Sequence, residues 1–245
     1  MIQDDLIAAR KTKFIELAKD LKKLKLKFGL PNALCVDVFD EKLIDTVSDL
    51  GIDYFQFAIE SGSEYTQKHL INKGVPLEKA KRLVKYTKAK DQRVFVSLIL
   101  GVPNETKELM EESINYYRDL DVDWAYIFTA LPLPGTKMFQ QFLANGVMDE
   151  ASFDWDGVRH GKRTFDTEEI TAEELEILTY DTNIELNFFN NSNIRNGRYQ
   201  EAIDIFNYMV LDLFPYQIVA RYCRGVANLH LKKYSEAKKD FEECV

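Results

Sequence analysis

The first 146 residues alternate short β-rich runs with longer helical patterns, and this alternation restricts the chain to few folds. The β-rich runs begin near residues 33, 53, 93 and 123. Amphipathic patterns of helical period separate them, as at 40–51, 76–90 and 105–120. Strands that alternate with helices of this length indicate βαβ units and a parallel sheet. We therefore predict an α/β fold with four parallel strands, which are too few to close a barrel by themselves.

Two strand-to-helix junctions carry the residues of this region that are most suited to chemistry. Apolar runs pass into polar, glycine-containing turns at 57–63 (FAIESGS) and at 97–106 (SLILGVPNET), and these turns supply Glu60 and Glu105. Ligands on parallel α/β scaffolds bind at the carboxyl ends of strands, so this edge is the predicted site. Glu105 has a second interpretation, as an acid in the first turn of the next helix, where the helix dipole favours it. Glu60 favours a ligand role, because an acid directly after an apolar strand costs free energy if it is buried unpaired.

Composition excludes several classes of protein. The net charge of −8 argues against nonspecific binding to nucleic acid, which needs a basic surface. The longest apolar run, around 94–102, is too short to span a membrane, and residues 1–11 do not resemble a secretory signal.

Cysteine is limited to three widely spaced positions, Cys35, Cys223 and Cys244, which predicts a reducing, cytoplasmic location. His69 and His160 have no partner at metal-ligand spacing, so no metal site is predicted.

The pattern changes after residue 146. Residues 147–170 are polar and typical of a linker, and residues 171–245 are helical throughout. An internal repeat relates 197–210 to 232–245 at an offset of 35, so that Ala202 and Phe206 match Ala237 and Phe241. This small–large pair resembles the second helix of a tetratricopeptide repeat, with Gly225 as the small residue of the preceding helix. Such positions pack helices together, and the helices offer a surface to a protein partner.

The order of these motifs resembles the C-terminal two-thirds of a radical S-adenosylmethionine barrel. The motifs are FAIESGS, the Lys73-Gly74 turn, SLILGVPNET and LPLPGT at 131–136. The branch that they resemble includes methylthiotransferases, the Elongator-type catalytic subunit and cobalamin-dependent radical enzymes. The resemblance covers about residues 2–146 and implies a partial (β/α)6 barrel there, followed by the tetratricopeptide-like tail.

The resemblance implies a role toward S-adenosylmethionine for eight residues. Asp4 and Asp5 would lie near the methionyl amine, and Glu60 and Ser61 near the ribose. Ile99, Gly101 and Glu105 match a motif that flanks adenine and methionine, in which Ser97 stands where a glycine is common. The backbone around Phe128 would line the adenine pocket.

The cysteines depart from the family pattern. The family holds a [4Fe–4S] cluster with three thiolates in a C-x-x-x-C-x-x-C loop, which this sequence lacks. Three explanations follow: a fragment of a longer radical enzyme, a degenerate homologue that acts as a binding module, or a separate chain that supplies the missing strands. We expect a fragment, because the first barrel strand is missing at one end and the last repeat has no neighbour at Val245.

Two functions of different classes follow from the sequence. In the first, the parent protein is a radical S-adenosylmethionine enzyme that makes a 5′-deoxyadenosyl radical, with cobalamin as a conceivable second cofactor. This chain would then supply part of the cofactor pocket and would be inactive alone. In the second, the chain is a noncatalytic interaction module built on the helical repeats, with a degenerate α/β domain. Neither function involves nucleic acid or a membrane.

Overall fold

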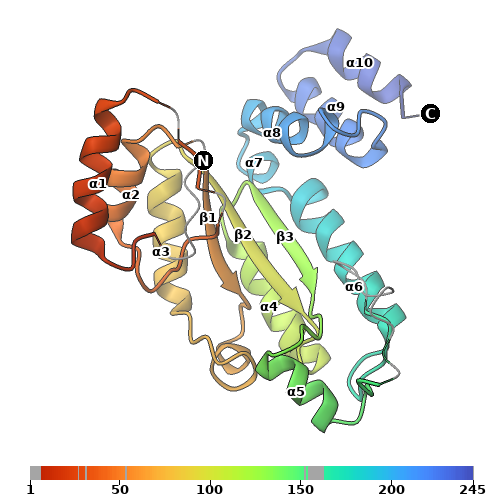
Figure 1. The fold of residues 1–245 in the computed structure, drawn as a ribbon. Coiled ribbons are helices and arrows are strands. Elements are labelled where there is room, and N and C mark those ends of the chain that lie inside the picture. The colour runs from red at the N-terminus through yellow and green to blue at the C-terminus, as the bar shows by residue number, and fades with distance from the viewer. Residues whose placement is uncertain are drawn as a thin grey trace.

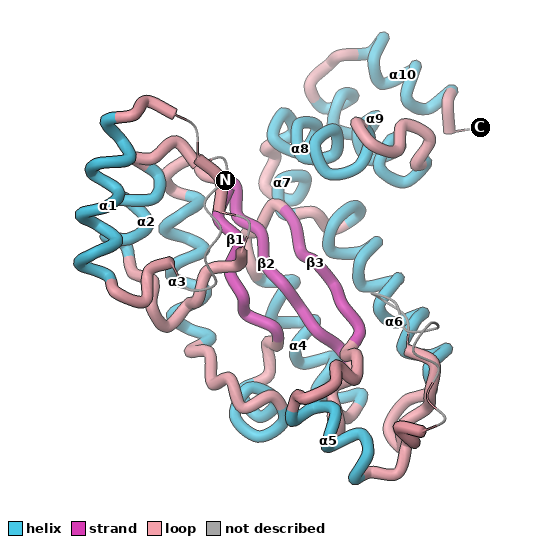
Figure 2. The backbone as a smooth tube through the Cα atoms, viewed as in Figure 1, coloured by secondary structure: helices cyan, strands magenta, loops and turns pink. Residues whose placement is uncertain are grey.

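The computed structural model describes residues 7–26, 28–30, 32–52, 54–151, 153 and 163–244. Three strands and a larger number of helices make up the described chain (Figures 1 and 2). In chain order they are α1 (Lys11–Lys23), α2 (Glu41–Ser48), β1 (Tyr54–Glu60), η1 (Thr66–Leu70), α3 (Leu77–Lys88), β2 (Arg93–Leu100), α4 (Lys107–Asp119), β3 (Trp124–Thr129), α5 (Lys137–Ala144), α6 (Ala172–Ile184), η2 (Glu185–Phe189), α7 (Ser192–Arg195), α8 (Tyr199–Phe206), η3 (Asn207–Leu211), α9 (Ile218–His230) and α10 (Tyr234–Glu242), where η marks a π-helical turn.

The strands form one parallel sheet in the order β1-β2-β3. Helix α3 connects β1 to β2, and α4 connects β2 to β3, so the predicted βαβ units are confirmed. Figure 1 shows the strands side by side, with α5 near their carboxyl ends and α7–α10 beyond their amino ends. The parallel order brings the turns that follow the three strands to one edge of the sheet.

The fourth predicted strand, at 33–38, does not form. Leu34 makes one isolated bridge to Phe57, in which the Leu34 amide donates to the Gln56 carbonyl and the Leu34 carbonyl accepts from Ala58. The Cys35 carbonyl then accepts from the amides of Val38 and Phe39, which turns the chain toward α2. The pairing therefore ends after one residue, and the described chain has three strands where four were predicted.

Successive side chains of a strand point to opposite faces of the sheet, and the main core lies on one of these faces. Phe55, Phe57 and Ile59 of β1 are buried there with Val94, Val96, Leu98 and Leu100 of β2, against apolar residues of α2, α3 and α4. Full burial of such a side chain contributes roughly 1.5–3 kcal/mol. Helix caps fix the start of the covering helices: Asp40 accepts from the Leu43 amide at α2, as predicted, and Thr106 from the Leu109 amide at α4.

The tail packs on the free edge of the sheet, through α6 and η2 beside β3. The Asn187 side chain is fully buried and acts as a substitute for a neighbouring strand. Its Oδ1 accepts from the Ala125 amide at 2.7 Å, and its Nδ2 donates to the Ala125 carbonyl at 2.7 Å. The edge of β3 is therefore closed at this residue by the tail.

We expect Asn187→Ala to lower the free energy of unfolding by about 2 kcal/mol, because it leaves two buried backbone groups unpaired. Asn183→Ala, also on the tail and without a hydrogen bond of its side chain among the described residues, is the matched control. Urea denaturation of both variants measures the difference. Equal stability of the two variants would show that Asn187 does not serve as the partner of β3.

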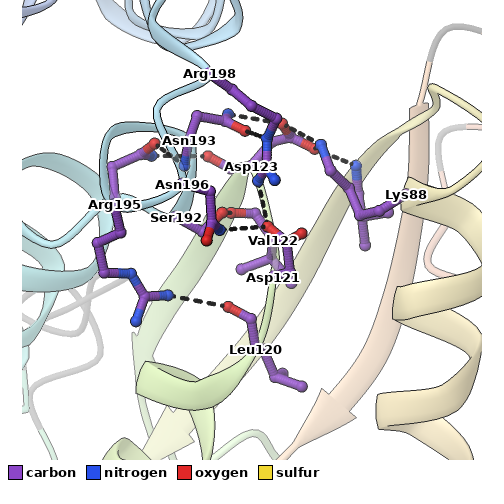
Figure 3. Close-up of polar contacts among 12 residues, drawn as sticks. Lys88, Leu120, Asp121, Val122, Asp123, Ser192, Asn193, Arg195, Asn196 and Arg198 are labelled. Atoms are coloured by element: carbon purple, nitrogen blue, oxygen red, sulfur yellow. Dashed lines mark hydrogen bonds and ion pairs between the residues drawn. The ribbon is translucent and has the colours of Figure 1, made fainter.

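A polar cluster joins the tail to the amino edge of the sheet (Figure 3). The Asp123 carboxylate accepts from Lys88 at 2.8 Å, from the Val94 amide at 2.7 Å and from Asn193 at 2.8 Å. Ser192 donates to the Val122 carbonyl at 2.6 Å. Helix α3, strand β2, the start of β3 and helix α7 therefore meet at one buried carboxylate.

The helices of the repeat region pack as small-to-large pairs. Ala202 and Ala237 are buried at equivalent places in α8 and α10, and the Phe241 ring lies against Gly225 of α9. Asn228 donates to the Asp240 carboxylate at 3.2 Å. The tetratricopeptide-like identity of the tail stays a prediction. No helix within the described ranges is long and apolar enough to cross a membrane.

Candidate functional site at the carboxyl edge of the sheet

The carboxyl ends of the strands bring together six of the eight residues predicted to contact a cofactor. Glu60 ends β1, and Ser61 follows it. Ile99 lies near the end of β2, with Gly101 and Glu105 in the turn beyond it, and Phe128 lies near the end of β3. Asp4 and Asp5 lie outside the described residues. The predicted gathering of these turns at one edge is therefore observed for the six.

The turn after β1 packs tightly on α4. Ser61 is buried and its hydroxyl lies 2.8 Å from that of Ser113, while Ser63 donates to Glu112 at 2.8 Å. A Cβ on Gly62 would lie 2.4 Å from Cβ of Tyr116 and 2.7 Å from the Ser113 carbonyl oxygen. Only glycine fits this approach, so the turn is held in one position against the helix.

Gln67 is a buried residue of this edge that the sequence did not single out. Its Nε2 donates to the carbonyls of Ile59 at 2.6 Å and Ser61 at 2.7 Å, and its Oε1 accepts from Val75 at 3.2 Å. It lies in η1, within a polar stretch whose pattern gives no sign of burial. Gln67 satisfies the carbonyls at the end of β1, and thereby supports the turn that carries Glu60.

Glu105 holds the turn after β2. It precedes Thr106, the N-cap of α4, so it does not lie in the first turn of the helix. Its carboxylate accepts from the amides of Gly101 at 2.8 Å and Val102 at 3.2 Å, and from Thr66 at 3.2 Å. Burial raises the pKa of Glu105 to about 7, while these three hydrogen bonds oppose the shift. The carboxylate therefore connects the turns after β1 and β2.

Arg163 also stabilises the turn after β2. The sequence placed it in a polar linker, yet its side chain is 2% exposed. Its guanidinium donates to the carbonyls of Gly101, Phe165 and Ile170, each at 3.0 Å. Burial lowers the pKa of Arg163 to about 10. Together, Arg163 and Glu105 bind the carbonyl and the amide of Gly101, whose φ is +75°.

Three of the six residues remain partly open at this edge. The Glu60 side chain is 19% exposed and accepts from Lys73 at 2.8 Å, which brings the predicted Lys-Gly turn to the site. Its backbone is left-handed, with φ of +72°, a conformation that is costly for a non-glycine residue and concentrates at functional sites. Ile99 and Phe128 are half-buried and present apolar surface.

The cysteines do not fit a [4Fe–4S] cluster. Cys35 lies in the turn before α2, far along the chain from the buried Cys223 of α9 and from Cys244 after α10. Burial raises the pKa of the Cys223 thiol to about 12, which disfavours the thiolate that a cluster needs. Within the part of the chain that the structure describes, no three His, Cys, Asp or Glu side chains are grouped to hold a metal ion.

Comparison with known proteins finds relatives that agree with the family that the sequence motifs resemble. Residues 6–117 match the family model of the Radical SAM superfamily. The chain is 30% identical over 154 residues to the cytidylyl-2-hydroxyethylphosphonate methyltransferase of Streptomyces wedmorensis, covering 60% of this chain and 29% of that one. It is 32% identical over 102 residues to the tRNA-2-methylthio-N(6)-dimethylallyladenosine synthase of Geobacillus thermodenitrificans, covering 40% and 19%. The chain therefore spans less than a third of the length of these relatives.

The fold resembles that of a solved protein over almost the whole chain. This is the radical S-adenosylmethionine methyltransferase TsrM from Kitasatospora setae, solved with cobalamin and a [4Fe–4S] cluster bound. The TM-score is 0.52 at 13% identity, over 98% of this chain and 51% of that one. The family match and the sequence relatives together show that residues 6–117 of this chain are similar in sequence to the Radical SAM superfamily.

Proposed function

We propose that the chain forms the C-terminal part of a radical S-adenosylmethionine barrel, and that the complete protein is an enzyme that cleaves this cofactor. The superfamily uses S-adenosylmethionine and a [4Fe–4S] cluster. One-electron reduction of the bound cofactor breaks its C5′–S bond and supplies methionine and a 5′-deoxyadenosyl radical. The observation that carries the proposal is the assembly of Glu60, Ile99, Gly101 and Phe128 at one edge, at strand ends and in turns that buried polar contacts fix.

The residues at the edge fit an adenosine group. The Glu60 carboxylate binds Lys73 through one oxygen and, being partly exposed, has acceptor capacity left for a ribose diol. Ile99 and Phe128 offer apolar surface for a flat base. Ser61, Gly101 and Glu105 make protein contacts with the groups described above, so in this proposal they shape the turns, and Glu60 makes the polar contact with the cofactor.

The cluster ligands belong, in this proposal, to a part of the parent protein outside these 245 residues. The three cysteines of the chain are unsuited to the role, and no step is assigned to them. Cobalamin is included as a second cofactor of the complete protein. The role of this chain is to bind the nucleoside, orient it and keep water from the edge.

Anaerobic cluster reconstitution of the protein made from its complete reading frame, with this chain in parallel, tests the proposal. We expect 5′-deoxyadenosine on reduction with S-adenosylmethionine, from the longer protein only. Glu60→Gln should raise the KM for S-adenosylmethionine about tenfold, because hydrogen bonds to charged groups contribute roughly 1.5–3 kcal/mol. Glu64→Gln, on an exposed residue paired with Lys68, is the matched control.

Two results would contradict the proposal: no 5′-deoxyadenosine from the complete protein, or a Glu60→Gln variant that behaves as Glu64→Gln does. Adding hydroxocobalamin to the same reaction tests the second cofactor through the absorbance of the bound corrinoid.

A noncatalytic interaction module is the second candidate function, and one feature of the tail favours it. Leu213, Phe214 and Tyr216 are 71%, 64% and 90% exposed in the loop between η3 and α9. Exposed apolar groups of this size are typical of protein-binding surfaces. This candidate predicts that the complete protein makes no 5′-deoxyadenosine, so the cleavage assay decides between the two functions.

A further inference from the structure

The face of the sheet opposite α2–α4, called the inner face here, has an unusual composition. Its residues alternate along each strand with those of the main core. They are Tyr54, Gln56 and Ala58 of β1, Phe95, Ser97 and Ile99 of β2, and Trp124, Tyr126 and Phe128 of β3. The face is therefore largely aromatic, and the polar groups near its middle are the Gln56 amide and the hydroxyls of Ser97 and Tyr126.

Other elements cover both ends of the inner face. At the amino end, Phe95 and Trp124 form a cluster with Phe188 and Phe206 of the tail, and the half-buried Tyr54 and Tyr126 pack against this cluster. At the carboxyl end, Ile99 packs against the cluster that contains Phe142 of α5. The middle of the face lies between these two clusters. A strand rises about 3.3 Å per residue, so Ser97 and Tyr126 lie about 7 Å from Ile99 and Phe128 toward the amino ends.

Three polar side chains in this middle region have no hydrogen-bond partner among the described residues. The Ser97 hydroxyl is buried and unpaired, in a residue that is only 5% exposed. The Gln56 amide and the Tyr126 hydroxyl, on half-buried residues, make no side-chain hydrogen bond within the described chain. Ser97 pairs with Tyr126 in the ladder, and Gln56 pairs with Phe95, which precedes Ser97 by two residues on the same face of β2.

An unpaired buried hydroxyl needs an explanation, because it costs roughly 1–3 kcal/mol. Beside Ser97, the rings of Tyr126 and Phe128 are nearly parallel, at 13° with centroids 6.2 Å apart, and the Phe95 ring meets Tyr126 edge-on at 6.1 Å. The unpaired polar groups therefore border a flat aromatic surface.

We propose that the middle of the inner face binds the substrate through a planar heteroaromatic ring with donors and acceptors along one edge. The ring lies on Tyr126, and its edge exchanges hydrogen bonds with Ser97 and Gln56. A hydroxyl and an amide can each donate and accept, which suits an edge that carries both N–H and C=O groups. The Ser97 hydroxyl is closed to water in this structure, so a ligand that binds it must displace a neighbouring side chain.

That the ligand is a substrate rests on the proposed function. The ligand would bind next to the cofactor edge. The ring would lie about two residues along the strands from Ile99 and Phe128, within reach of a group held at the carboxyl ends. Binding itself needs only residues of this chain, so it can be tested without cofactor cleavage.

The test is an NMR titration of this 245-residue chain with quinazolin-4-one, a planar probe whose edge carries N–H and C=O. Cyclohexanecarboxamide, which has an amide but no aromatic ring, is the control probe. We expect saturable binding of quinazolin-4-one only, about fivefold weaker in Ser97→Ala, because one hydrogen bond contributes about 1 kcal/mol. Ser48→Ala removes the other unpaired buried hydroxyl of the described residues, on α2, and should leave the affinity unchanged.

Thermal denaturation of the same variants separates a ligand role from a structural one. Ser97→Ala should melt at or above the wild-type temperature, because its hydroxyl has no partner within the described chain. A lower melting temperature would assign the hydroxyl a structural bond and overturn the inference. Equal affinity of Ser97→Ala and Ser48→Ala, or no binding of the probe, would also overturn it.

The two proposals fail separately. Formation of 5′-deoxyadenosine together with Ser97-independent binding of the probe would remove this inference and keep the proposed function. Ser97-dependent binding without formation of 5′-deoxyadenosine in the complete protein would leave a binding site and remove the proposed function.

Discussion

Asp123→Ala is expected to lower the free energy of unfolding by about 3–5 kcal/mol, the largest effect of any single substitution considered for this protein. The side chains of Asp123 and Lys88 are 3% and 13% exposed, so their charges are largely removed from water. Removing one partner of a buried pair leaves the other charge uncompensated. The substitution also leaves the Val94 amide and the Asn193 side chain without their acceptor.

The measurement is chemical denaturation followed by fluorescence and by circular dichroism. Asp121→Ala is the control: Asp121 is a nearby carboxylate that binds Arg198, but this pair is about a third exposed, and such pairs contribute at most about 1 kcal/mol. Because the Asp123 cluster spans sheet and tail, both probes should report one transition in the wild-type protein. An Asp123→Ala loss below about 1 kcal/mol would contradict this account of the cluster.

The second large effect is a loss of stability as the pH rises, caused by Glu105. Its pKa is about 7 in the folded protein and near the ordinary 4.5 in the unfolded chain. Below pH 4.5 both states hold the proton, so the contribution to stability is complete. Between pH 4.5 and 7 the unfolded chain releases the proton first, and stability falls. At 1.36 kcal/mol per pKa unit, the loss is on the order of 3 kcal/mol.

Glu105→Gln isolates this contribution from that of the other titrating groups. The glutamine keeps an acceptor for the amides of Gly101 and Val102 and gains a donor for Thr66, but it does not ionise. We expect wild type and variant to differ in the pH dependence of urea denaturation, with wild type losing about 3 kcal/mol relative to the variant from pH 4.5 to 8. Parallel curves over that range would exclude a raised pKa at this position.

The elements that form through local patterns could be predicted from the sequence. The helices near 40–51 and 76–90 and the strands at 53–59, 93–100 and 123–130 appear as expected, because the period of apolar residues and the helix caps are local properties. The run at 33–38 has the same β-rich composition but makes only one bridge. What ends its pairing is the turn at the Cys35 carbonyl, which composition does not encode.

The location of the candidate site followed from topology, and the contacts within it did not. Parallel strands bring their carboxyl ends to one edge, so Glu60 and Gly101 could be grouped in advance. The bonds of Glu105 depend on how the turns after β1 and β2 meet in space. The composition around Arg163 predicts a polar linker, and the burial of this residue results from a segment that folds back over Gly101. Long-range packing of this kind leaves no periodic signal.

The tail could also be predicted only in part from the sequence. Its helices and the small-to-large positions of the repeat follow from the sequence, and Ala202 and Ala237 are buried. Its attachment to the sheet does not follow, since Asn187 and Asn193 bind residues more than sixty positions earlier. An asparagine-rich stretch at 187–193 is typical of a loop, and here it closes a sheet edge and binds a buried aspartate.

Hydrogen–deuterium exchange of the reconstituted complete protein, with and without S-adenosylmethionine, tests the central claim most directly. The claim is that the carboxyl edge of this sheet forms part of the cofactor pocket. We predict slower exchange on addition of the cofactor at 60–63, 99–105 and 128–130, and unchanged exchange in α8–α10. Unchanged exchange at the three turns, or protection confined to the tail, would contradict the claim.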